Sequence, residues 1–210
     1  MHDSTVTVLV GGSAGLHPAL VGPFGDDLDV VGRTETGATT IDRVLADLPD
    51  VLALDVRIAG PDLRAVARRI REWAPATRIV LVTDHDDEQA YTALVAGASA
   101  AVTPTAGTTA LADAIRGLTR GESLLLPRMA RRLLDDLDAW ATRSADPLHP
   151  PPTLTATERE VLACRAQGAE PAAIASTHGV TPRLVNLHAG FAVAKLHRYV
   201  LVSERISAPR

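Results

Sequence analysis

The sequence is poor in several residue types on which small proteins commonly rely. Six of its 210 residues are aromatic, and there is one cysteine, Cys164, and one lysine, Lys195. A single cysteine excludes an intramolecular disulfide and fits a reducing compartment. No apolar run approaches the roughly 18 residues of a transmembrane helix, and the first residues lack the features of a signal peptide. We therefore expect a cytoplasmic protein with no membrane partner.

The chain does have ample apolar sequence and an uneven distribution of charge. Apolar residues make up 46% of the sequence, which is enough for a substantial core. The net charge is −4, but residues 1–152 carry 14 basic and 21 acidic side chains, whereas residues 153–210 carry 7 and 4. An acidic front and a basic tail indicate two modules, with any nucleic-acid contact in the tail.

The front of the chain alternates short apolar segments with segments of helical periodicity. The expected strands are 5–10, 29–32, 51–55, 78–83 and 100–103, and the expected helices are 39–48, 63–73, 87–96 and 108–118. This alternation predicts a five-stranded parallel sheet with helices on both faces. The segment after the first strand contains Pro18, Gly22, Pro23 and Gly25, which predict a short or irregular helix there.

A proline-rich segment separates this region from the tail. One more amphipathic helix is expected at 127–141, and residues 142–153 then contain four prolines. We therefore place a sheet domain at 1–125, a helix and linker at 126–152, and a helical domain at 153–210.

The tail carries the start signals of three helices. A capping box at Thr155 and Glu158 opens the first helix. The second is expected at 170–177, and the third opens with Thr181 as its N-cap and runs to about Leu196. Two short helices, a glycine-containing turn and a longer capped helix predict a helix-turn-helix domain.

Several stretches in both halves carry a resemblance to a known family. They are PDVLALD at 49–55, RIVLVT at 78–83, DDEQAYTALVAGAS at 86–99, LADAIRGLTRGESLLLP at 111–127 and LTATEREVLACRAQG at 154–168. With the order of elements, they resemble a response regulator of the NarL/FixJ type. The resemblance implies a flavodoxin/CheY-like α/β receiver domain followed by an all-α LuxR-type helix-turn-helix domain. It also implies a transcriptional regulator that binds double-stranded DNA and is not an enzyme.

The receiver half departs from the family at positions that the phosphoryl switch requires. In the resemblance, Asp55 is the phosphoacceptor position and Thr83 supplies the hydroxyl that binds the phosphoryl group. Two acidic residues after the first strand should hold the Mg²⁺ that neutralises the incoming charge. Gly11 and Gly12 stand there instead, and Pro104 replaces the lysine after the fifth strand. We therefore expect regulation that is independent of phosphorylation, and no cofactor.

The glycines at 11–15 also suggest a phosphate cradle. The sequence GGSAG matches neither the P-loop nor the dinucleotide-binding pattern, and no lysine is nearby, so we favour a lost magnesium site. A pocket around Ser13 and Asp55 at the carboxyl edge of the sheet is a candidate site for a small ligand, and a collapsed pocket is the alternative. We expect the aspartates within 84–87 to solvate the start of the next helix.

In the resemblance, the helix that follows Thr181 is the recognition helix and lies in the major groove. Helical spacing turns one set of residues toward the core: Val185, Ala189, Ala192 and Leu196. Asn186 is suited to adenine, and Arg183 to guanine or phosphate. The candidate DNA-binding residues are Thr181, Arg183, Asn186, Leu187, His188 and Gly190, with Lys195, Arg198 and Arg205 as backbone contacts.

The recognition face is less cationic than the family pattern, which leaves alternatives open. Asn186 stands where lysine is usual, and Leu187, Gly190 and Phe191 occupy positions that are commonly polar. The helix could instead pack on a protein partner, in an interaction or ligand-sensing module that acts through another regulator. A regulator that is still phosphorylated on Asp55 is a further reading. We expect a homodimer on paired half-sites, with a heterodimer as the alternative.

Overall fold

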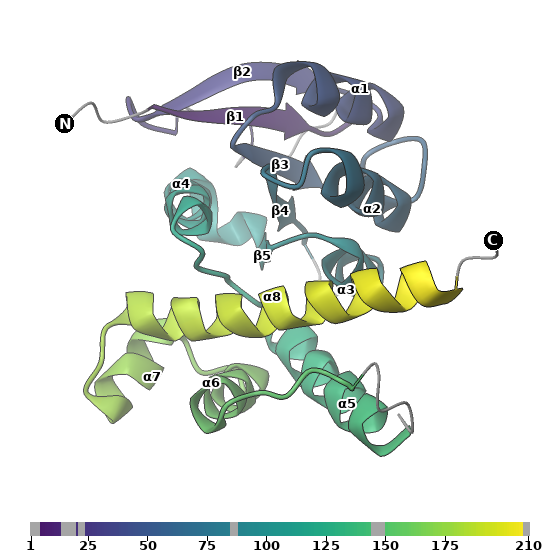
Figure 1. Cartoon of the computed structure of the whole chain (residues 1–210). Coiled ribbons are helices and arrows are strands. Elements are labelled where there is room, and N and C mark those ends of the chain that lie inside the picture. The colour runs from purple at the N-terminus through teal and green to yellow at the C-terminus, as the bar shows by residue number, and fades with distance from the viewer. Residues whose placement is uncertain (1–4, 14–19, 21–23, 85–87, 144–149, 208–210) are drawn as a thin grey trace. The chain divides into compact units, whose positions relative to one another are not determined.

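The structure is a computed structural model of the chain, and it describes residues 5–13, 20, 24–84, 88–143 and 150–207 (Figure 1). The side chains of residues 143 and 205–207 lie outside this description. The chain forms two compact units, Met1–Leu124 and Leu125–Arg210. In the part of the chain that is described, no helix combines the length and the apolar character needed to cross a membrane.

The first unit is built on a five-stranded parallel sheet, as the sequence predicted. Its strand order is β2-β1-β3-β4-β5, the flavodoxin-like order, in which β1 lies between β2 and β3. The strands are β1 Val6–Gly11, β2 Leu28–Thr34, β3 Val51–Asp55, β4 Arg78–Val82 and β5 Ala100–Val102. All residues of β3 are buried, which agrees with its continuous apolar sequence and its central place between covered faces.

Helices cover both faces of this sheet. One face carries α1 Gly37–Asp47, α2 Leu63–Trp73 and α3 Glu88–Ala96, and the other carries α4 Gly107–Thr119 (Figure 1). Alternate strand residues such as Val8, Ala53 and Val80 pack toward Leu111 and Ile115 of α4. Pro18, Gly22 and Pro23, on which the prediction of an irregular first helix rests, lie outside the described residues.

The second unit consists of helices. They are α5 Pro127–Arg143, α6 Ala156–Ala166, α7 Pro171–His178 and α8 Pro182–Ser207. The predicted capping box opens α6, with both reciprocal hydrogen bonds between Thr155 and Glu158 present. The prediction that the third helix ends near Leu196 was wrong, because α8 continues to Ser207. The sequence after Leu196 has no glycine or proline to stop it before that point.

The helix α5, which the sequence analysis grouped with the linker, packs with the C-terminal helices. Arg159 of α6 forms a salt bridge with Asp138 of α5, with a shortest N···O distance of 2.8 Å. The rings of Trp140 and Tyr199 lie 5.1 Å apart between centroids. The buried guanidinium of Arg165 also donates to Leu125 O, from Nη2 at 2.7 Å and from Nε at 3.2 Å.

Candidate receiver pocket and DNA-binding helix

The predicted receiver residues converge at the carboxyl edge of the sheet. Gly11 ends β1 and pairs with Leu54 of β3, so it lies beside Asp55 at the point where the strand order reverses. Asp55 pairs with Val82, which places Thr83 on the neighbouring strand end. Thr83 is buried, and its backbone N–H donates to Val102 O at the end of β5.

The Asp55 carboxylate is engaged by a residue that the sequence analysis missed. Arg57 donates to Oδ1 from its backbone N at 2.9 Å and from Nε at 3.0 Å, and to Oδ2 from Nη2 at 2.8 Å. The Asp55 side chain is only 3% exposed. These hydrogen bonds raise the pKa of Arg57 above its ordinary value, so the guanidinium is a permanent cation on the carboxylate.

Two neighbours hold this arginine segment in place. Ser13 Oγ donates to the backbone O of Arg57 at 2.9 Å, which ties the loop after β1 to the loop after β3. Arg57 Nη1 lies 3.9 Å from Asp84 Oδ2, so the guanidinium also faces a second acid. Ser13 and Asp55, predicted to border a vacated pocket, are thus bridged by Arg57. Asp86 and Asp87 lie outside the described residues.

A side chain at Gly11 would be crowded, and its neighbours would have to shift to admit it. A Cβ atom on Gly11 would lie 2.9 Å from Leu54 Cδ1 and 3.1 Å from Thr40 Oγ1. Thr40 in turn shares a 2.6 Å hydrogen bond with Thr34, so the space beside Gly11 is already filled. Gly12 is also buried, and its N–H donates to Thr34 O at 2.9 Å.

These residues do not fit the magnesium ion that the receiver fold implies. Positions 11 and 12 offer no side-chain oxygen, and both oxygens of Asp55 accept hydrogen bonds from Arg57. Pro104, at the position of the family lysine, is buried at the start of the short 3-10 helix η2 Pro104–Ala106. Within the described residues, no cluster of three or more histidine, cysteine or acidic side chains could hold a metal ion.

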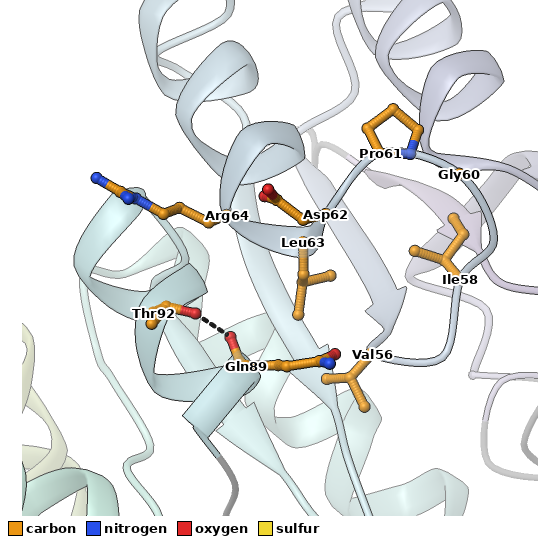
Figure 2. Close-up of a pocket in the computed structure, with 9 residues that line it drawn as sticks. All are labelled: Val56, Ile58, Gly60, Pro61, Asp62, Leu63, Arg64, Gln89 and Thr92. Atoms are coloured by element: carbon orange, nitrogen blue, oxygen red, sulfur yellow. Dashed lines mark hydrogen bonds between the residues drawn. The ribbon is translucent and has the colours of Figure 1, made fainter.

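A cavity of about 420 Å³ lies next to this edge, between the start of α2 and α3 (Figure 2). Its described lining residues are Val56, Ile58, Gly60, Pro61, Asp62, Leu63, Arg64, Gln89 and Thr92. The lining is mixed, with apolar side chains from the loop after β3 and from Leu63, and polar ones from Asp62 and the two helices. Neither Ser13 nor Asp55 is among them, so the predicted pocket and this cavity are separate places on the same edge.

The N-terminal half of α8 presents the predicted DNA-binding residues. Thr181 caps the helix, because its Oγ1 accepts from Leu184 N at 3.3 Å. The side predicted to face the core is buried at all four positions, Val185, Ala189, Ala192 and Leu196. Arg183 and Arg198 are exposed, and Asn186, Leu187, His188 and Gly190 are half-buried. The backbone-contact expectation for Arg205 falls on a side chain outside the described residues.

Two aromatic side chains pack on each other in this half of α8. The rings of His188 and Phe191 meet edge to face, with centroids 6.1 Å apart. His188 Nδ1 is buried and has no hydrogen-bond partner within the described parts of the chain. Phe191 is 49% exposed, so the histidine ring supports one side of an aromatic side chain whose other side faces solvent.

Lys195, predicted to contact DNA, forms an ion pair inside the second unit. Its Nζ donates to Glu158 Oε2 at 2.6 Å and to Thr153 O at 3.0 Å. Burial alone would raise the pKa of Glu158, but the hydrogen bonds from Lys195 and Thr155 outweigh it and lower that pKa. The capping box identified Glu158 as part of a helix start. No local signal in the sequence indicated its pairing with Lys195, which lies 37 residues further along the chain.

The comparisons with known proteins agree with this architecture. No protein-family model matches the chain. It is 32% identical to the probable transcriptional regulatory protein NarL of Mycobacterium tuberculosis over 182 residues, which cover 86% of this chain and 80% of that protein. The receiver domain of the putative response regulator NarL from that bacterium has been solved; it is 31% identical, with a TM-score of 0.51, and covers 56% of this chain and 98% of its own.

A structure of RcsB dimers bound to DNA matches over both domains. It covers 98% of this chain and all of its own, with a TM-score of 0.50 and 19% identity, and it shows the same fold. The M. tuberculosis relative is named as a probable transcriptional regulatory protein, and it matches across both the sheet unit and the helical unit. The chain therefore belongs to the NarL/LuxR family of response regulators, DNA-binding transcriptional regulators with a receiver domain and a helix-turn-helix domain.

Proposed function

We propose that this response regulator controls transcription without a phosphoryl switch. The observation that carries the proposal is the contact of Arg57 with both carboxylate oxygens of Asp55. Phosphoryl transfer needs a free carboxylate oxygen as nucleophile and a cation that compensates the charge on the transferred group. Arg57 occupies the nucleophile, and the glycines at 11 and 12 supply no ligand for a cation.

We assign the DNA contacts to the N-terminal half of α8. Thr181, Asn186, Leu187, His188 and Gly190 would face the major groove together with Arg183, and Arg198 would contact the phosphate backbone. The two internal hydrogen bonds of Lys195 support a role in positioning α8 against α6, with one N–H left for a phosphate. RcsB binds DNA as dimers, which supports a homodimer on DNA for this chain too. Paired half-sites and a cytoplasmic location remain part of the proposal.

The domain division that we propose follows the two compact units. The receiver-like domain would comprise residues 1–124, and α5 would belong to the DNA-binding half, which then includes the proline-rich linker. The cavity beside Val56 favours a second candidate function, in which a small ligand replaces phosphate as the signal. In a heterodimer with a conventional regulator, the partner would instead provide the phosphoryl switch.

The test uses the purified full-length protein without treatment by a phosphodonor. Bound fragments are selected from genomic DNA at low and moderate salt, and the affinity for the enriched site is then measured with and without acetyl phosphate and Mg²⁺. We expect a defined inverted-repeat site, equal affinities, and the same affinity for Asp55→Asn. An acyl phosphate on Asp55 with a changed affinity would contradict the proposal, as would recovery of no DNA by the folded protein.

A further inference from the structure

The outer side of the first turns of α8 is apolar. Leu184, Leu187 and Phe191 are spaced by three and four residues and therefore lie on one side of the helix, and we call them the apolar patch. Leu184 is 38% exposed and Phe191 49% exposed, and Leu187 lies between them, half-buried. The opposite side, with Val185 and Ala189, is buried against α6 and α7.

The apolar patch occupies the part of a recognition helix that reads DNA bases. It starts two residues after Pro182, the first residue of α8, and ends about two turns further on. In a helix-turn-helix domain, the N-terminal residues of this helix contact base edges, and later residues contact the backbone. The location of the patch therefore favours DNA bases over a protein surface as its occupant.

The charges around the apolar patch are few. Arg183 precedes it and Arg198 follows it, whereas the Lys195 ammonium is held by Glu158 and Thr153 O. A helix with few phosphate contacts gains little affinity from counterion release. Contacts of the patch itself must then contribute more of the binding energy.

We propose that Leu187 and Phe191 bind the 5-methyl groups of thymine in the major groove. The thymine methyl is the apolar group that base pairs display there, and apolar side chains are its natural partners. The edge-to-face contact with His188 restrains the Phe191 ring, so that less conformational entropy is lost on binding. The inference rests on the proposed function, because it assigns the base preference of the same helix.

The experiment isolates the methyl group itself. The full-length protein is used to select sites from a randomised duplex library, and each thymine of the enriched site is then replaced by uracil, which lacks only the 5-methyl group. We expect uracil at one or two positions per half-site to weaken binding by about fourfold per methyl, the effect of exposing one buried methyl group.

Two variants connect this effect to the apolar patch. Leu187→Ala and Phe191→Ala remove partly exposed side chains, so the fold should be preserved, and each should abolish the uracil effect at its own position. Val202→Ala is the matched control, because Val202 is 38% exposed on the same helix but lies beyond the patch. We expect this variant to bind like the wild type and to keep the full uracil effect.

The outcomes separate this inference from the proposed function. A specific site that is bound equally with thymine and uracil would overturn the methyl contact and leave DNA recognition intact. A uracil effect that persists unchanged in both alanine variants would assign the methyl contact to other residues and also overturn the inference. No DNA binding by the folded protein, with self-association that Phe191→Ala abolishes, would overturn both and make the patch a protein interface.

Discussion

Arg57 makes its bidentate contact with Asp55 although half of its own side chain is exposed. The Asp55 side chain is 3% exposed beneath this contact, and removal of the guanidinium takes two charge-assisted hydrogen bonds from its carboxylate. We expect Arg57→Ala to lower the free energy of unfolding by about 1–3 kcal/mol, a range discounted for the exposure of the arginine. Urea unfolding of the full-length chain measures this change.

The matched controls for that prediction distinguish charge from geometry. Arg57→Lys keeps the charge but not the two-pronged contact, so we expect an intermediate loss of stability. Adding Asp55→Asn to Arg57→Ala removes the carboxylate charge that Arg57 compensated and should restore part of the stability. Equal losses in the single and the double variant would show that the Asp55 charge carries no penalty in the absence of Arg57.

The ion pair of Glu158 and Lys195 makes stability depend on pH. The pKa of Glu158 is lower in the folded protein than its ordinary value of 4.5, so the unfolded state binds more protons near that pH. This contribution to stability is complete above the ordinary pKa and is lost as the pH falls through the folded pKa.

We expect Lys195→Met to lower the free energy of unfolding at pH 7 by about 2–3 kcal/mol, since it leaves a buried carboxylate without its partner. The difference from the wild type should shrink at pH 4, where the variant's Glu158 becomes protonated. Denaturant unfolding at both pH values is the measurement. An equal difference at the two values would argue against the ion pair as its cause.

At the scale of elements, the end of β1 is packed too closely to regain an acidic pair. We expect Gly11→Asp to destabilise the protein by about 1–3 kcal/mol, because its Cβ would displace the buried Leu54 side chain and crowd Thr40. Combining it with Gly12→Asp and Pro104→Lys should not restore phosphorylation by acetyl phosphate and Mg²⁺. Detection of an acyl phosphate in this triple variant would contradict the steric argument.

The elements were predictable because their signals are local, and the state of the site was not. Apolar runs such as 51–55 and caps such as Thr155 identify strands and helix starts within a few residues. The absence of the acidic pair at positions 11 and 12 could also be recognised from the sequence. The contact of Arg57 depends on the turn after β3, which Ile58 N closes onto Asp55 O at 3.1 Å. An arginine two residues after a buried aspartate was the one available signal for it.

At the scale of the whole molecule, the DNA-binding half depends on the chain that precedes it. Arg165 is 7% exposed, and its guanidinium donates to Leu125 O and Ala169 O. A fragment of residues 153–210 lacks the first acceptor and all of α5. We expect it to be less stable than a fragment of residues 125–210 by about 2 kcal/mol or more, as a buried donor loses its partner.

Thermal unfolding of the two fragments measures this difference. Arg165→Met in the shorter fragment removes the guanidinium that has lost its Leu125 acceptor and should recover part of the loss. Equal stability of the two fragments would place the functional boundary at the proline-rich linker instead. The extension of α8 to Ser207 could not be predicted with the same ease, because helix ends without glycine or proline are weakly encoded in sequence.

The position of Arg57 in the chain has a consequence for the response of this regulator to its surroundings. A diffusible metal ion occupies its site according to mass action, so chelators and cellular ion levels change its occupancy. A cation tethered two residues from its carboxylate is present at a fixed effective concentration and does not dissociate into solution. The charge on Asp55 is therefore compensated to the same extent whatever the cellular magnesium concentration, because its counterion belongs to the same polypeptide chain.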